Sequence, residues 1–309
     1  MAVTRMKVLV CDPIDEEAIK MLKEKGFEVD YKPTISYQEL KNSVQDYDAL
    51  LVRSRTKVTR EIIEAGKKLK AIGRAGVGLD NIDLEAAKER GIKVVNAPES
   101  LTQSVVELVI GFMVALSRFM CKADRTMKEG KWLKTEFLGH ELSGKTLGIV
   151  GFGRIGRGVA KVAKALGMNI LVYDVIKVDE KTLSELQAKQ VELDELLKSS
   201  DFVTIHVPGG PSTYHLITID KLKLMKPTAF IINTSRGNVI KEDDLVYALK
   251  NKIIAGAALD VFEVEPPTNK ELLSLDNVIL TPHIGGETVE AQRLAGTLTV
   301  QRLIEALGL

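Results

Sequence analysis

The chain has 309 residues, a length typical of two domains rather than one. Hydrophobic residues make up 45% and charged residues 28%, a balance that excludes disordered and fibrous proteins. The 43 lysines and arginines almost cancel the 42 aspartates and glutamates. The resulting net charge of +1 gives no reason to expect a nucleic acid or an anionic membrane as partner.

The cysteines and the apolar runs bear on the compartment. Cys11 and Cys121 are too few for a disulfide framework and form no CxxC pair, which indicates a reducing cytoplasm. Residues 1–5 lead directly into a strand-like run, so we expect no secretory signal. The longest apolar run, Leu108–Ser117, is well short of the about 20 residues that cross a bilayer. We therefore expect a cytoplasmic protein that does not contact a membrane.

Short apolar runs alternate with amphipathic stretches in the first third of the chain. This alternation predicts parallel βαβ units. Two expected helices, over 15–25 and 83–90, each end at a glycine, which is typical of a helix C-terminus. The expected strands are Lys7–Cys11, Phe27–Tyr31, Ala49–Val52, Leu69–Ile72 and Ile92–Val95.

The segment Asn96-Ala97-Pro98 interrupts the pattern, and we expect one long helix from about Thr102 to Lys128 to follow it. Apolar residues cover nearly its whole circumference between Val105 and Met120. Such a helix is buried on several sides, either in a core or in a subunit interface.

A second alternating unit begins at Lys145, with expected helices over 154–166, 193–198 and 242–250 and a final helix from about Glu287 to Ala306. The two halves predict an α/β fold with two doubly wound parallel-sheet domains that divide near residues 97–103. The expected strands of the second half are Thr146–Val150, Asn169–Tyr173, Phe202–His206, Ala229–Asn233, Ile253–Ala258 and Val278–Leu280.

A Gly-x-Gly-x-x-Gly motif, Gly151–Gly156, follows a predicted strand and opens a predicted helix. In this context Gly151 permits a tight turn, Gly153 lets the backbone approach a pyrophosphate, and Gly156 lets helix and strand pack closely. Asp174 ends the next strand, where its carboxylate can accept hydrogen bonds from an adenosine ribose and would repel a 2′-phosphate. We therefore predict NAD as cofactor, although Lys177 nearby could favour NADP instead.

Three side chains at the ends of consecutive predicted strands suit the reduction of a 2-keto acid. Arg236 can pair with a carboxylate and lie beside a carbonyl oxygen. His283 can deliver a proton, and a carboxylate such as Glu265 would raise the pKa of an imidazole beside it. Singly, each has a plainer explanation, namely a solvated cap, a loop charge or a turn residue. Their order along the chain favours the joint, catalytic interpretation.

The other histidines give no second site. His206 ends a strand near the predicted cofactor, whereas the polar surroundings of His140 and His215 indicate surface residues. No histidine has metal-ligand spacing to a cysteine or another histidine, so we expect no metal.

The chain resembles the D-isomer-specific 2-hydroxyacid dehydrogenases, and among them most closely the phosphoglycerate dehydrogenases. The resemblance covers nearly the whole chain. It is carried by Val52–Thr59, Gly73–Asp83, Asn96–Pro98, Gly130–Trp132, Glu141–Gly148, Gly151–Gly156, Asn233–Gly237, Ala258–Phe262 and Thr281–Gly286.

This resemblance implies a Rossmann NAD-binding domain, 99–286, inserted into a flavodoxin-like substrate-binding domain, 1–98 plus 287–309, with catalysis in the cleft between them. It implies that Arg236, Glu265 and His283 are catalytic and that Asp260 contacts the nicotinamide carboxamide. It also implies a homodimer formed through the 102–128 region. The implied cofactor-binding residues are Val77, Gly151, Gly153, Arg154, Ile155, Gly156, Asp174, His206, Val207, Pro208, Thr234, Ser235, Arg236, Asp260, His283, Gly285 and Gly286.

The residues expected to bind the substrate match the family pattern less completely. The amides of Gly76, Val77 and Gly78 are expected to hold the substrate carboxylate, because a glycine-rich turn exposes N–H groups as an anion nest. Asn81 and Asp83 are expected to stabilise that loop instead. Relatives often have Asn where this chain has Leu101 and Ser where it has Glu287. The implied substrate-binding residues are Arg53, Ser54, Arg74, Gly76, Val77, Gly78, Arg236 and His283.

Three functions remain open. The resemblance favours the interconversion of D-3-phosphoglycerate and 3-phosphohydroxypyruvate, the first step of serine biosynthesis. A glyoxylate or hydroxypyruvate reductase on the same fold is the first alternative, and an NAD(H)-sensing, corepressor-like binding protein is the second. Because the resemblance covers the family's shared core without the C-terminal regulatory domain of longer relatives, we expect no feedback inhibition by serine.

Overall fold

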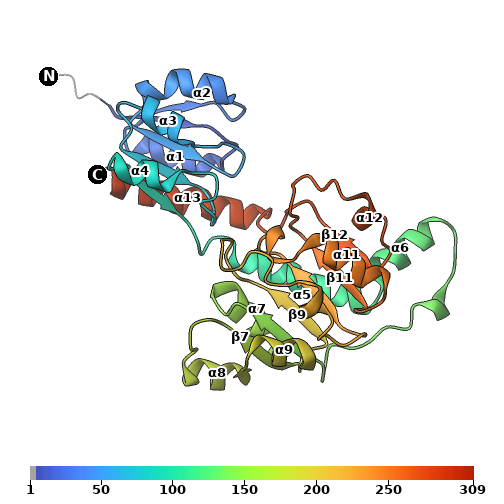
Figure 1. Cartoon of the computed structure of the whole chain (residues 1–309). Coiled ribbons are helices and arrows are strands. Elements are labelled where there is room, and N and C mark those ends of the chain that lie inside the picture. Colours follow the sequence, from blue (N-terminus) through green and yellow to red (C-terminus); the bar gives the residue numbers. More distant parts are fainter. Residues whose placement is uncertain (1–4) are drawn as a thin grey trace. The chain divides into compact units, whose positions relative to one another are not determined.

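The computed structural model describes residues 5–309. Residues 1–4, on which the expectation about a secretory signal rests, lie outside the described residues. The chain forms two compact units (Figure 1). Unit 1 takes in the chain up to Thr102 together with Gly286–Leu309, and unit 2 is Gln103–Gly285.

The sheet of unit 1 has five parallel strands in the order β2-β1-β3-β4-β5. This order is that of a doubly wound, flavodoxin-like sheet and confirms the predicted fold class for this unit. The strands are β1 (Lys7–Val10), β2 (Glu28–Tyr31), β3 (Ala49–Val52), β4 (Ala71–Arg74) and β5 (Lys93–Asn96). The helices are α1 (Glu16–Glu24), α2 (Tyr37–Ser43), α3 (Arg60–Ala65), α4 (Leu84–Glu89) and α13 (Val289–Ala306).

Alternate residues of each strand in unit 1 are buried under different helices. Leu9 and Leu50 pack under α2, α3 and α4 on one face. Val8 and Leu51 pack under α1 and α13 on the other face. The C-terminal helix α13 therefore completes a core that is otherwise built from the first hundred residues, and Figure 1 shows it in red among the blue elements. Its first turn is capped by Thr288, whose side chain accepts a hydrogen bond from the amide of Ala291.

The sheet of unit 2 has seven parallel strands in the order β12-β11-β10-β9-β6-β7-β8. The chain reverses direction across the sheet between β6 and β9, and ligands of such sheets bind beyond the strand ends at this point. The strands are β6 (Thr146–Val150), β7 (Asn169–Tyr173), β8 (Ala188–Gln190), β9 (Phe202–Ile205), β10 (Phe230–Asn233), β11 (Gly256–Leu259) and β12 (Val278–Leu280). The helices are α5 (Thr102–Ser117), α6 (Met120–Lys128), α7 (Arg154–Ala165), α8 (Glu180–Leu186), α9 (Leu193–Ser199), α10 (Ile219–Leu222), α11 (Glu242–Lys250) and α12 (Lys270–Leu273).

Both faces of this second sheet are covered. Helices α9, α10 and α11 pack on one core through leucines such as Leu196, Leu222 and Leu245. Helix α5 lies close against α7 at Gly158, where a Cβ would come within 2.7 Å of a Val106 methyl carbon. The predicted doubly wound second domain is confirmed as a fold.

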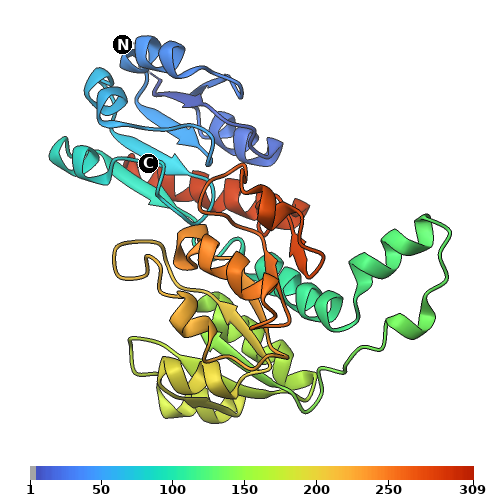
Figure 2. The same ribbon diagram turned by 45° about the vertical axis from the view of Figure 1, so that its right-hand side comes forward.

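The prediction of one continuous helix from Thr102 to Lys128 is wrong. The helix ends at Ser117, Phe119 takes a left-handed conformation with φ of 55°, and α6 continues at an angle of 65° to α5. A tertiary contact accompanies the break, since the amide of His140 donates to the carbonyl of Ser117 at 3.0 Å and takes the place of a further helical donor. The returning chain thus binds the end of α5, and in Figure 2 the green segment that includes α6 extends away from the sheet of unit 2.

Several short elements were not predicted, namely α2, α3, α8, β8, α10 and α12. Each has at most seven residues, too few to show a clear apolar period. Within the described residues no single helix is long and apolar enough to cross a membrane. Helices α5 and α6, which are bent against each other, reach the required length and apolar composition only when they are taken together.

Candidate active site

The glycine loop of unit 2 has the geometry that its sequence predicts. Gly151 has a φ of 93°, and a Cβ there would lie 2.6 Å from the carbonyl oxygen of His206. A Cβ at Gly156 would lie 2.3 Å from the carbonyl oxygen of Gly151, so α7 can approach the loop only with glycine at this position. Apart from its chain neighbours, no heavy atom of the described chain lies within 4 Å of a Cβ built on Gly153. The loop is closed towards the protein and open at the N-terminus of α7, where a phosphate binds most favourably.

Asp174 lies directly after β7, beside this loop. Its carboxylate accepts hydrogen bonds from the amide of Phe152 at 2.7 Å and from the amide of Ile176 at 2.9 Å. The residue therefore also fixes the loop, a role that sequence reasoning did not include. Each carboxylate oxygen can accept more than one hydrogen bond, so the predicted contact with a ribose is compatible with these bonds.

Two buried polar atoms near the strand ends point to a bound ligand. Among residues 5–309, no group makes a hydrogen bond with the Nδ1 of His206 or the Oγ1 of Thr234. His206 Nε2 is 2.9 Å from the hydroxyl of Thr204, and burial lowers the pKa of His206 to about 3, which keeps the imidazole neutral. Buried polar groups in proteins nearly always have a partner. These two atoms, together with the open glycine loop, fit a dinucleotide at the edge formed by the ends of β6, β9 and β10.

The structure brings the predicted catalytic residues of unit 2 to one edge of the sheet. Strands β10, β11 and β12 are neighbours, and their register aligns Asn233, Leu259 and Leu280. Arg236 follows the first of these strands, Glu265 follows the second and His283 follows the third. All three therefore lie at the carboxyl ends of adjacent parallel strands, where the active sites of open α/β sheets are found.

His283 and Glu265 form a direct pair. The Nδ1 of His283 is 2.8 Å from Oε2 of Glu265, and the other carboxylate oxygen accepts a hydrogen bond from the amide of Phe262 at 3.2 Å. The histidine has a φ of 54°, in the left-handed region that few residues other than glycine adopt. A carboxylate on Nδ1 leaves Nε2 to exchange a proton with a substrate, and the pair is partly exposed, with side-chain accessibilities of 51% and 39%.

The turn that carries His283 is held by Asp260, which is 1% exposed. One oxygen of its carboxylate accepts hydrogen bonds from the hydroxyl of Thr281 at 2.6 Å and the amide of Ile284 at 2.7 Å. The other oxygen accepts from the amide of Gly285 at 2.7 Å. This role was missed by sequence reasoning, which assigned Asp260 only a contact with the cofactor.

Arg236 is positioned by Asn233, which is also 1% exposed. The side-chain oxygen of Asn233 accepts from the amide and the hydroxyl of Ser235, and its amide nitrogen donates to the carbonyl of Arg236 at 2.9 Å. The Arg236 side chain lies against Gly209, where a Cβ would come within 3.1 Å of its Cγ. The turn after β10 is thus fixed by one buried side chain.

The expected anion nest lies in unit 1, after β4. Gly76 has a φ of 139°, and its carbonyl accepts a hydrogen bond from the amide of Ala97 at 2.9 Å. The carbonyl of Val77 accepts from the side chain of Asn96 at 2.6 Å. The amides of Gly76, Val77 and Gly78 donate to no acceptor in the part of the chain that the structure describes. Successive N–H groups of this kind form an anion-binding concavity.

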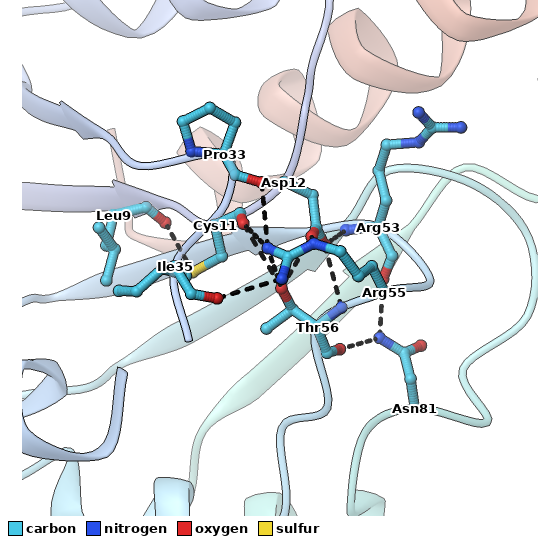
Figure 3. A network of polar contacts seen from close by, with 9 residues as sticks. All are labelled: Leu9, Cys11, Asp12, Pro33, Ile35, Arg53, Arg55, Thr56 and Asn81. Carbon is cyan, nitrogen blue, oxygen red and sulfur yellow. Dashed lines mark hydrogen bonds and ion pairs between the residues drawn. The ribbon is translucent and has the colours of Figure 1, made fainter. Parts of the chain in front are cut away.

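Arg53 and Arg55 follow β3 in the same unit and differ in role (Figure 3). Arg55 is part of the fold, because its Nε is 2.9 Å from Asp12 and its other nitrogens donate to the carbonyls of Cys11, Pro33 and Ile35. In Figure 3 the Arg53 side chain extends away from this network.

The loop of residues 53–56 is fixed from two sides. Asp12, 1% exposed, accepts hydrogen bonds from the amide of Arg53 at 2.5 Å and the hydroxyl of Thr56 at 2.8 Å. The side chain of Asn81 donates to the carbonyls of Arg53 and Thr56, each at 2.7 Å. Asn81 and Asp83 were predicted to stabilise the Gly76 loop, but the contacts described for them hold other segments: Asn81 binds the loop of residues 53–56, and Asp83 caps α4 by accepting from the amide of Ala86 at 2.8 Å. Asp12 was not identified from the sequence.

The remaining histidines, His140 and His215, lie outside this site. His140 is exposed, as predicted. His215 is only partly exposed, because its ring stacks on Tyr214 and its Nε2 is 2.9 Å from Glu263, so the surface interpretation was incomplete. In residues 5–309 no three His, Cys, Asp or Glu side chains are grouped to hold a metal ion.

Comparison with known proteins agrees with this geometry. Residues 110–285 match the family model described as D-isomer specific 2-hydroxyacid dehydrogenase, NAD binding domain. The chain is 49% identical to the D-3-phosphoglycerate dehydrogenase of Methanocaldococcus jannaschii over 303 residues, covering 98% of this chain but 57% of that protein. It is 47% identical to the hydroxypyruvate reductase of Thermotoga maritima over 308 residues, covering 99% of each.

A solved structure of a protein from Thermus thermophilus has a TM-score of 0.91 and 34% identity to this chain, covering 98% of it and 97% of that protein. This similarity extends over both units, so each of them has a counterpart in a known structure. The chain belongs to the D-isomer specific 2-hydroxyacid dehydrogenase family, and its residues 110–285 form the NAD-binding domain of that family.

Proposed function

We propose that this protein is an NAD-dependent oxidoreductase that interconverts a 2-hydroxy acid and its 2-keto acid at C2. The observation that carries the proposal is the His283–Glu265 pair, with 2.8 Å between Nδ1 and Oε2. His283 follows β12 and Glu265 follows its neighbour β11, and Arg236 follows β10 on the other side of β11. These residues share a sheet edge with a glycine loop that fits a dinucleotide. The same edge therefore offers a proton donor, a fixed cation and a cofactor site.

Each residue has a chemical task in this proposal. Glu265 holds the imidazole of His283 so that Nε2 can protonate the carbonyl oxygen of the keto acid and take the proton back in the reverse direction. The guanidinium of Arg236 pairs with the carboxylate and polarises the carbonyl. When bound, NADH supplies the hydride that the carbonyl carbon receives.

The cofactor would be held by the loop Gly151–Gly156, by Asp174, and by the residues that follow β9 and β10. In unit 1 the amides of Gly76, Val77 and Gly78 would bind the substrate carboxylate. Because Asp174 carries a negative charge where a 2′-phosphate would lie, NAD is preferred to NADP.

For the physiological substrate we propose D-3-phosphoglycerate and 3-phosphohydroxypyruvate, which would place the protein at the first step of serine biosynthesis. The supporting observations are the 49% identity to a D-3-phosphoglycerate dehydrogenase and the two arginines, Arg53 and Arg74, beside the Gly76 loop. A hydroxypyruvate or glyoxylate reductase is the second candidate. It is favoured by the full-length match to a hydroxypyruvate reductase and by an ion pair that engages Arg53.

We also propose a homodimer formed through α5, α6 and the segment that follows them. Large apolar side chains are exposed there, with Met120 at 52%, Trp132 at 77% and Leu138 at 87%. Exposed apolar groups of this size mark interaction surfaces. Light scattering coupled to size-exclusion chromatography would give twice the chain mass, and a monomer at micromolar concentration would contradict the dimer.

The enzymatic proposal is tested by following NADH absorbance with 3-phosphohydroxypyruvate, hydroxypyruvate and glyoxylate in parallel. A kcat/KM much higher for the phosphorylated acid supports the phosphoglycerate branch. Equal or higher values for the small acids assign the protein to the reductases. No turnover of any 2-keto acid, together with a stable protein partner, would instead support an NAD(H)-sensing binding protein.

A further inference from the structure

The carboxylate of Glu287 forms an ion pair with Arg53, one of the residues expected to bind the substrate. The Nη2 of Arg53 is 2.5 Å from Oε1 of Glu287, and the Arg53 side chain is 23% exposed while that of Glu287 is 49% exposed. Both residues belong to unit 1. The pair links the loop after β3 to the residue that precedes the cap of α13.

Two hydrogen bonds fix the backbone of Arg53, so its side chain starts from a defined position. Buried Asp12 accepts from its amide, and Asn81 donates to its carbonyl. The loop also lies beside the anion nest, because β3 pairs with β4 and the amide of Ala75 donates to the carbonyl of Val52 at 2.8 Å. A substrate whose carboxylate lies on the nest would therefore have Arg53 within reach of groups further along the molecule.

We propose that Glu287 determines substrate specificity by competing with a distal anionic group of the substrate for the guanidinium of Arg53. This inference rests on the proposed function and deepens it. A phosphate on C3 has to displace the Glu287 carboxylate from Arg53, whereas glyoxylate has no such group and leaves the pair intact. Displacement would also place two anions close together, which opposes binding.

The local structure makes such an exchange feasible. Glu287 is about half exposed, so its carboxylate can turn into solvent at little cost. Gln292 offers it a second partner, because Nε2 of Gln292 lies 3.5 Å from the same Oε1 and donates to the carbonyl of Gly286 at 2.7 Å. The strength of the Arg53–Glu287 pair then sets how much of the affinity that Arg53 could add for a C3 phosphate is lost to the competing carboxylate.

The test is the substitution Glu287→Gln, which removes the charge and keeps the size of the side chain. We expect the ratio of kcat/KM for 3-phosphohydroxypyruvate to that for glyoxylate to rise about threefold to tenfold, the range for one partly exposed charged contact. Glu290→Gln is the matched control, because it removes an exposed carboxylate from the same segment outside the site and should leave the ratio unchanged. In an Arg53→Gln background, Glu287→Gln should have no further effect on the ratio.

Calorimetric titration of D-3-phosphoglycerate gives a second readout that needs no turnover. Binding to the Glu287→Gln protein should tighten by the same factor relative to the parent. If the parent reduces no 2-keto acid, the proposed function fails, and the titration still decides the role of Glu287. If the parent is active but the ratio and the affinity do not change, or change equally in Glu290→Gln, the competition is disproved.

Discussion

The turn that carries His283 depends on one buried carboxylate, and replacing it should affect stability and catalysis together. Asp260 accepts three short hydrogen bonds, from Thr281, Ile284 and Gly285. In Asp260→Asn the amide oxygen can still serve two of these donors. The new NH₂ group, however, faces the amide of Gly285, which is then left buried without an acceptor.

The size of this effect follows from the contacts. Leaving one buried donor unsatisfied costs about 1–3 kcal/mol, and the two remaining bonds lose the strengthening that a charged acceptor provides. We expect Asp260→Asn to lower the free energy of unfolding of unit 2 by about 2–4 kcal/mol. Thr281→Val removes only one donor and leaves the carboxylate in place, so it should cost about 1 kcal/mol.

Catalysis should follow the position of the turn. A displacement of about 1 Å of a catalytic group reduces the rate by about 10²-fold, so kcat for a 2-keto acid should fall by that order in Asp260→Asn and much less in Thr281→Val. Urea unfolding measures stability, NADH titration by fluorescence measures cofactor affinity, and steady-state kinetics measure kcat. Parent-like stability and kcat in Asp260→Asn would refute the role of Asp260 in holding the turn that carries His283. Weakened NADH binding with unchanged stability would instead support a contact between Asp260 and the cofactor.

Three further outcomes are expected. His283→Ala should keep NADH binding but lose about 10²-fold or more in kcat, while His140→Ala, at an exposed position, should match the parent; equal rates in both variants would exclude His283 from the mechanism. Asp174→Ala should weaken NADH binding more than NADPH binding, and an unchanged ratio of the two dissociation constants would contradict the specificity argument. Burial raises the pKa of the Cys11 thiol, so a thiol reagent should not label Cys11 in the folded protein, and labelling of a Cys121→Ser variant before unfolding would show that Cys11 is accessible.

The parts of the fold that depend on local sequence could be predicted. The glycine loop was identified from its spacing, because the φ of 93° at Gly151 and the close contact at Gly156 are properties that only glycine supplies. The placement of Arg236, Glu265 and His283 at one sheet edge could be predicted because the three residues follow consecutive strands, and parallel strands bring such positions to one edge.

The features that depend on distant contacts could not be predicted. The apolar pattern continues through Phe119, yet the helix ends at Ser117, where Phe119 is left-handed and the amide of His140 binds the Ser117 carbonyl. The roles of Asp12 and Asp260 likewise depend on backbone amides far away in the sequence. One signal was present, since an acidic residue inside an apolar stretch must find donors if it is buried.

Asp12 and Asp260 show why specificity can change in this fold without loss of chemistry. Each is a buried carboxylate after a strand that fixes a neighbouring backbone segment, the Arg53 loop in unit 1 and the His283 turn in unit 2. A substitution at either should disturb stability, because buried donors lose their acceptor. Glu287 and the guanidinium of Arg53 are partly exposed, and neither fixes a buried backbone segment in the contacts described for unit 1. Substrate preference can therefore shift at Glu287 while Asp12 and Asp260 continue to hold the Arg53 loop and the His283 turn.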